Sequence, residues 1–99
     1  MIPKFNRIKN HSAVDSCRKG YCEHCGGIWH PVPHHVYSVG SGAPDVPLNL
    51  ISLCIICHTK AHSGQIGRAR QLEIIARREG MEPVEVEEKL YQMRRGNIE

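Results

Sequence analysis

Apolar residues recur every three or four positions in the last third of the chain, a pattern that predicts two amphipathic helices. The first spans residues 68–79 and ends before Gly80, because glycine is the usual residue just past a helix end. The second begins at Pro83, since proline suits the first turn of a helix. Their apolar faces are formed by Leu72, Ile75 and Ala76 in the first helix and by Val86, Leu90 and Met93 in the second.

Two short runs in the middle of the chain have the composition of β-strands. His35–Val39 mixes β-branched and aromatic residues, and Leu48–Leu53 is mostly apolar. The Gly- and Pro-containing segment 40–45 between them indicates a loop, so the two strands should form a short antiparallel hairpin. A helix from about Cys54 to His62 should follow. The sequence therefore predicts an α+β fold in which a hairpin and a helix precede the two C-terminal helices.

The central segment, residues 21–64, has little apolar material and is rich in Gly, Pro, His and Cys. Segments of this composition need a metal or disulfides to hold a fold. We expect the 99 residues to form one domain with a basic N-terminal arm (1–20), a metal-bound core (21–64) and a helical extension (65–99). The chain has no membrane-spanning run and no signal-like N-terminus, which predicts a cytoplasmic protein whose cysteine pairs bind metal.

Charge is distributed unevenly along the chain, although the net charge is only +3. The first twenty residues carry five basic residues and one acidic residue, whereas the core carries one basic residue and two acidic ones. A basic arm beside a near-neutral core fits contact with a polyanion such as nucleic acid, and it fits ordinary solubility equally well. Charge alone therefore leaves both interpretations open.

Two cysteine pairs, Cys22/Cys25 and Cys54/Cys57, each have the C-x-x-C spacing. Two such pairs can close an all-thiolate tetrahedral site with no open position, which is typical of structural Zn²⁺. The alternatives are disulfides or free thiols. Cys17 is left without a partner by spacing. If the pairs hold zinc, residues 21–64 should unfold without it, because metal-binding energy is then folding energy.

The histidines predict a second metal site. His58 and His62 lie four residues apart on the predicted helix, so both rings face the same side and can bind one ion. His34, on the neighbouring strand, is the candidate third ligand, which would leave a position open for water or a phosphate oxygen. Its neighbour His35 faces the other way on the strand and is either a general base or a packing residue. The remaining histidines are interpreted as bystanders: His11, His24 and His30.

Taken together, these motifs resemble the HNH endonuclease family over residues 21–64. The matching elements are the two C-x-x-C pairs, the His-His-Val at 34–36, the Asn-Leu-Ile-Ser-Leu-Cys that begins at Asn49, and the final histidine. The resemblance implies a ββα-metal finger with a four-cysteine zinc site. It also implies that His35 is the general base and that Asn49 fixes the hairpin and orients that base. The implied ligands of the catalytic divalent metal are His34, His58 and His62.

The family resemblance implies a metal-dependent endonuclease that hydrolyses DNA and leaves 3′-hydroxyl and 5′-phosphate ends. Such an enzyme, encoded by a bacterium or phage, would nick one strand as a monomer or cut both as a homodimer. A site of three histidines accepts Mg²⁺, Mn²⁺, Ni²⁺ or Zn²⁺, and its lack of a carboxylate disfavours strict Mg²⁺ dependence. The alternative is a non-catalytic zinc-binding adaptor for nucleic acid or protein, which would hold one metal ion per chain instead of two.

Basic residues near the predicted sites are candidates for phosphate contacts. The arginines of the last two helices either pair with the glutamates around them or contact phosphates, which would position DNA without reading its sequence. No recognition helix or aromatic stacking platform stands out, so weak sequence preference is expected. The candidate nucleic-acid-binding residues are Lys60, Arg18, Lys19 and Arg68.

Overall fold

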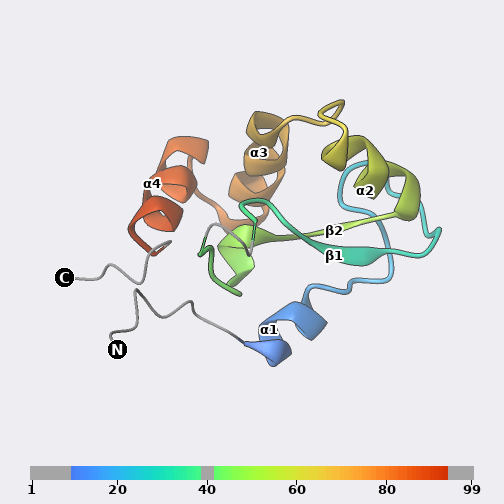
Figure 1. The fold of residues 1–99 in the computed structure, drawn as a ribbon, viewed down its shortest axis with the longest axis horizontal. Coiled ribbons are helices and arrows are strands. Elements are labelled where there is room, and N and C mark those ends of the chain that lie inside the picture. The colour runs from blue at the N-terminus through green and yellow to red at the C-terminus, as the bar shows by residue number, and fades with distance from the viewer. Residues whose placement is uncertain (1–9, 39–41, 94–99) are drawn as a thin grey trace, which may run out of the picture.

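The computed structural model describes residues 10–38 and 42–93 and has a small α+β fold. In Figure 1 a two-stranded hairpin lies in the middle of the molecule, with α2 and α3 above it and α1 below it. No helix in these ranges is long and apolar enough to cross a membrane. The described elements are α1 (His11–Ser16), β1 (Val32–His35), a 3₁₀ turn (Pro47–Asn49), β2 (Leu50–Leu53), α2 (Ile55–His62), α3 (Arg68–Glu79) and α4 (Pro83–Met93).

The antiparallel hairpin is confirmed, but β1 lies earlier in the chain than predicted. It pairs His34 with Ile51 and His35 with Leu50, and then it ends. The predicted strand over residues 35–39 is right at His35 and wrong at residues 36–38, and Val39 lies outside the described residues. Likewise, β2 begins at Leu50, because the preceding three residues form the 3₁₀ turn.

Asn49 explains why the ladder stops. Its backbone carbonyl accepts from Val36 N at 2.9 Å, and its side-chain Oδ1 accepts from Tyr37 N at 2.8 Å. The backbone N–H of Tyr37 therefore bonds to a side chain rather than to the backbone of an opposite strand. A side-chain acceptor seldom takes the place of a backbone carbonyl of the neighbouring strand. Strand propensity therefore does not predict where this strand ends.

The helical extension follows the sequence prediction closely. Helix α3 ends at Gly80, whose left-handed backbone (φ 71°) caps the helix. The two helices pack against each other, and α3 also packs against β2. Five of the six predicted apolar side chains are buried, and Met93 is partly buried against them. The core lies between the hairpin and these helices and includes Ile51, Leu53, Leu72, Ile75, Val86 and Leu90.

Part of the predicted arm is helical. Helix α1 begins after Asn10, whose side-chain oxygen accepts from Ala13 N at 3.1 Å and caps the helix start. Residues 1–9, with three of the arm's basic residues, lie outside the described ranges, as do 94–99 with the arginines at 94 and 95.

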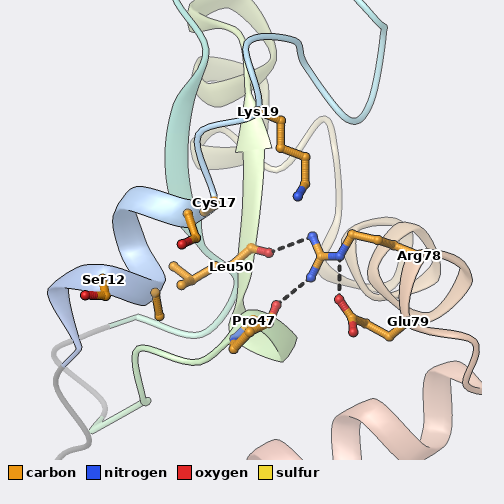
Figure 2. Close-up of a pocket in the computed structure, with 9 residues that line it drawn as sticks. Ser12, Cys17, Lys19, Pro47, Leu50, Arg78 and Glu79 are labelled. Atoms are coloured by element: carbon orange, nitrogen blue, oxygen red, sulfur yellow. Dashed lines mark hydrogen bonds and ion pairs between the residues drawn. The ribbon is translucent and has the colours of Figure 1, made fainter.

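Arg78 connects α3 to the start of β2 through hydrogen bonds. Figure 2 shows its guanidinium donating to the backbone carbonyl of Pro47 at 2.6 Å and to that of Leu50 at 3.1 Å. The same group pairs with Glu79 at 2.7 Å. Of the two interpretations of the helical arginines, pairing within the protein therefore applies to Arg78.

The other partner of Arg78 is Glu23, in the turn that carries the first two cysteines. The two side chains form an ion pair at 3.0 Å, with the Glu23 side chain only 6% exposed. Glu23 also accepts from Ser52 N at 2.8 Å, and its own backbone N donates to Ser52 O at 2.7 Å. One ion pair thus connects the cysteine turn, β2 and α3.

Candidate metal centres

The four predicted cysteines lie together at one end of the hairpin. Their sulfur atoms all lie within 4.8 Å of one another, and Cys25 Sγ is 3.7 Å from Cys54 Sγ. A tetrahedral zinc with Zn–S bonds of about 2.3 Å requires an S–S spacing of about 3.8 Å, far longer than a disulfide bond. The thiols are free of disulfides. The cluster can therefore hold a metal such as zinc, with Cys22 and Cys57 as the other two ligands.

Local backbone geometry explains how each pair is placed. The first pair lies on a tight turn in which Gly26 N donates to Cys22 O at 2.9 Å, and Gly26 takes the positive φ (79°) that the turn requires. The second pair opens α2: Cys54 is its N-cap, and the Cys54 sulfur accepts from Cys57 N at 3.4 Å.

The electrostatics of the cluster call for a cation. Burial raises the pKa of the Cys22 thiol, but hydrogen bonds from the backbone N–H groups of Cys25 and His24 help to lower it to about 7. By contrast, burial and the neighbouring thiols raise the pKa of Cys57 well above its ordinary value. Four thiolates at this spacing repel one another unless a positive ion lies between them.

Two residues beside the cluster complete its surroundings. His24, interpreted from sequence as a bystander, places ring Nδ1 3.5 Å from Cys57 Sγ. Cys17 is buried outside the cluster, and burial, followed by the charge of Glu23, raises its pKa to about 11. His24 is thus a neighbour of the metal ligands, whereas Cys17 is an unreactive core thiol.

The second cluster consists of His34 from β1 and His58 and His62 from α2. Their ring nitrogens all lie within 4.8 Å of one another, and Nε2 of His58 is 3.2 Å from Nε2 of His62. Zn–N bonds of about 2.0–2.1 Å in a tetrahedral site require an N–N spacing of about 3.4 Å. The donor set and its spacing therefore fit a divalent ion.

Burial keeps His34 and His58 in the form that binds metal. His34 is 8% exposed, and burial, followed by the charges of His58 and His62, lowers its pKa to about 4. Burial also lowers the pKa of His58, with a further contribution from His62. A neutral imidazole has a free lone pair, so His34 is ready to bind a cation at neutral pH.

His35 is bonded to a residue that sequence reasoning missed. Its Nε2 lies 2.8 Å from Oδ1 of Asp45, and the other carboxylate oxygen of Asp45 accepts from Asn10 N at 2.9 Å. Asp45 is 5% exposed. Its place in a Gly- and Pro-containing loop gave no signal, because acidic residues are common in exposed loops.

Asn49 holds the loop that carries Asp45. Its side-chain amide is fully buried and donates to the carbonyl oxygens of Tyr37 and Pro44, each at 3.1 Å. Because Pro44 precedes Asp45, the same amide that ends β1 also sets the position of the Asp45 backbone. This placement agrees with a role in fixing the hairpin.

A cavity of about 410 Å³ lies beside the histidines and is lined by His34, His35, His62 and Arg68 among others. The Arg68 guanidinium lies over the Tyr37 ring, 4.4 Å from its centroid. Lys60 is exposed on α2, between the two helix histidines in sequence. The other two candidate phosphate-binding residues lie elsewhere: Lys19 lines the cavity in Figure 2, and Arg18 is 4.0 Å from Asp15.

Gln71 is a second residue that the sequence analysis missed. It lies on α3, is 4% exposed and lines the histidine cavity. A signal was present: Gln71 precedes Leu72 and lies four residues before Ile75, which places a polar side chain on the apolar face of the helix.

The geometry is the basis on which a function can be argued for this chain. Comparison with known proteins finds no matching family model, no matching curated protein and no matching solved structure.

Proposed function

We propose that the protein is an HNH-type, metal-dependent endonuclease that hydrolyses DNA phosphodiester bonds. One observation carries the proposal: three histidine rings converge on one point, and the next residue after His34 is a histidine bonded to a buried carboxylate. A structural metal site needs four closed ligands, whereas three ligands with an open position are typical of catalysis. In this proposal β1, β2 and α2 form the ββα-metal finger, and the cysteine cluster holds its structural zinc.

His34, His58 and His62 would hold the catalytic divalent ion. When bound, a divalent cation polarises the scissile phosphate and stabilises the charge that develops on the leaving 3′ oxygen. The protein supplies a ligand set without carboxylates, so Mn²⁺, Ni²⁺ and Zn²⁺ suit it as well as Mg²⁺.

His35 acts as the general base in this mechanism. An ionised carboxylate only accepts hydrogen bonds, so Asp45 requires the proton of His35 to be on Nε2. Nδ1 of the neutral ring then carries the lone pair that takes a proton from the attacking water. The water oxygen bonds to phosphorus, the bond from phosphorus to the 3′ oxygen breaks, and solvent protonates that oxygen. The ends are a 5′-phosphate and a 3′-hydroxyl.

Basic side chains at the cavity would hold the DNA backbone. Arg68 lines the cavity, and its stacking on Tyr37 restricts where the guanidinium can move. Lys60 is exposed on the same helix as two of the histidines. Contacts of this kind position a phosphate without reading bases, so we expect weak sequence preference.

The test is cleavage of supercoiled plasmid with Mg²⁺, Mn²⁺, Ni²⁺ or Zn²⁺ added separately. Wild-type protein should convert the plasmid to nicked or linear DNA, and His35→Ala should lose this activity while its metal content stays unchanged. His11→Ala, which alters an exposed histidine of α1, is the matched control and should cut like the wild type. Nicked product indicates action on one strand, and linear product indicates a dimer. Lack of cleavage by folded, zinc-loaded wild type with every ion would overturn the proposal.

A non-catalytic adaptor is the second candidate, and one observation favours it. Several large apolar side chains beside the cysteine cluster are exposed, with Ile55 N bonded to Trp29 O at 3.1 Å. Exposed apolar residues of this kind can contact a partner protein. Metal analysis separates the two: the nuclease should bind a second ion at the histidines, whereas the adaptor should bind zinc at the cysteines alone. The exposed residues are Ile28, Trp29, Ile55 and Ile56.

A further inference from the structure

The amide of Gln71 has one satisfied end and one unsatisfied end. Its Nε2 donates to the backbone carbonyl of Ile66 at 3.0 Å in a buried hydrogen bond. Its Oε1 is buried and has no hydrogen-bond partner among the described residues. The amide cannot be reversed, because a carbonyl oxygen such as that of Ile66 must face a donor. The acceptor end of Gln71 is therefore held in place without a partner.

Buried carbonyl groups almost always accept a hydrogen bond, so this exception calls for a donor. Gln71 lines the same cavity as His34, so His34 is a candidate donor. A histidine that binds metal through one ring nitrogen carries a proton on the other, and that N–H is generally donated to a carbonyl or carboxylate. His34 is the most buried of the three ring ligands and needs such a partner within the protein.

We propose that Gln71 is a positioning residue for the metal site: its Oε1 accepts the ring N–H of His34 and thereby fixes the tautomer and orientation in which His34 binds the ion. This inference rests on the histidine metal site of the proposed function but not on DNA cleavage. It makes α3 part of the site, since Gln71 lies on that helix and is held there by its bond to Ile66.

Two variants isolate the acceptor. Gln71→Met keeps the side-chain size but removes both the donor to Ile66 and the acceptor for His34. Gln71→Glu removes the donor to Ile66, adds a carboxylate charge and keeps an acceptor oxygen for His34. Binding of Ni²⁺ to zinc-loaded protein, measured by titration calorimetry, should weaken about 10- to 100-fold in Gln71→Met and stay near the wild-type value in Gln71→Glu. Gln92→Met, in an exposed position on α4, is the control and should bind Ni²⁺ like the wild type.

A measurement on the wild type keeps the inference testable even if Gln71→Met fails to fold. With Zn²⁺ bound and the histidine rings labelled with ¹⁵N, the His34 ring N–H should be visible by NMR and exchange with water more slowly than that of exposed His62. Equal exchange, or equal Ni²⁺ affinity in folded Gln71→Met, would overturn the role of Gln71 while leaving the metal site intact. Wild-type protein that binds no ion beyond the cysteine zinc would overturn the metal site itself.

Discussion

Nε2 of His35 and Oδ1 of Asp45 lie 2.8 Å apart, although ten residues separate them in the chain. His35 lines the cavity, whereas Asp45 is buried behind it. The pair therefore gives the candidate base an orientation and a defined tautomer before any substrate binds. The bond between His35 and Asp45 also connects β1 to the loop that follows it.

Replacing Asp45 with asparagine should reverse the tautomer of His35. The amide oxygen of Asn can still accept from Asn10 N, so its NH₂ faces His35 and donates to Nε2, which leaves the proton on Nδ1. We expect plasmid cleavage by Asp45→Asn to fall about 100-fold or more, with metal content and fold unchanged. Asp15→Asn, at an exposed position on α1, should cut normally. A wild-type rate in Asp45→Asn would show that His35 does not need this partner.

Removing metal from the cysteine cluster should unfold the centre of the molecule. In such a site the free energy of metal binding is folding free energy, so chelation of zinc removes it. We expect amide signals of residues 21–64 to lose their dispersion in NMR spectra and Cys54→Ser to behave in the same way. Cys17→Ala removes a buried thiol outside the cluster and should keep its zinc. Retention of a folded hairpin without metal would contradict a structural role for the cluster.

His34 should make stability depend on pH when the histidine site is free of metal. Its pKa is about 4 in the folded protein and 6.5 in the unfolded chain, so the unfolded chain binds more protons between these values. The free energy of unfolding should therefore fall as pH decreases through that window, by about 2 kcal/mol from pH 7.5 to pH 5. Urea denaturation should show a larger decrease in the wild type than in His34→Gln, in which His58 still has a lowered pKa. Parallel pH profiles would contradict the burial of a neutral ring.

Arg78 should be the arginine of α3 whose loss costs most stability. Arg78→Met leaves the Glu23 carboxylate buried without its cation, which generally costs about 3–5 kcal/mol. Arg78→Lys should recover only part of this loss, because one ammonium cannot reach Glu23 and both backbone carbonyls together. Arg77→Met, at the exposed neighbouring position, should change the free energy of unfolding by less than about 0.5 kcal/mol. Equal stability of the two methionine variants in urea would refute this assignment.

Arg68 should contribute to DNA affinity without contributing to sequence preference. In a His35→Ala background, Arg68→Gln should weaken binding to unrelated DNA duplexes to the same extent and reduce the slope of log affinity against log salt by about 1. Arg70→Gln is the matched control, because Arg70 already pairs with Glu73 at 3.1 Å. Fluorescence anisotropy over a range of salt concentrations measures both quantities. An unchanged salt slope in Arg68→Gln would exclude a phosphate contact at this residue.

Elements that depend on residues close together in the sequence could be predicted, and these include most of the helices and both clusters. The bounds of α3 could be predicted from the spacing of its apolar residues and from Gly80. The two clusters could be predicted from the C-x-x-C pairs and from the four-residue spacing of two histidines. Strand β1 was misplaced because its end depends on the side chain of Asn49, twelve residues beyond Tyr37. Local propensity does not include such a contact.

The residues that were missed share another cause. Asp45 and Gln71 are polar residues that the fold buries, and their partners lie in other elements. Arg78 was read as one of several helical arginines, since nothing in the sequence distinguishes it from Arg77 beside it. Apart from the position of Gln71 on the apolar face of α3, the burial of these polar side chains depends on how elements pack and is seen only in the assembled fold.

Helix α2 carries ligands of both clusters in eight residues, with Cys57 followed directly by His58. Inserting or deleting one residue would turn everything beyond it by about 100° and move one set of ligands away from the other. We therefore expect the length of this helix to be constrained by both clusters. Sequence drift in α2 is left to the residues that face solvent, Ile55, Ile56 and Thr59, so relatives of this protein should vary there and keep the helix length constant.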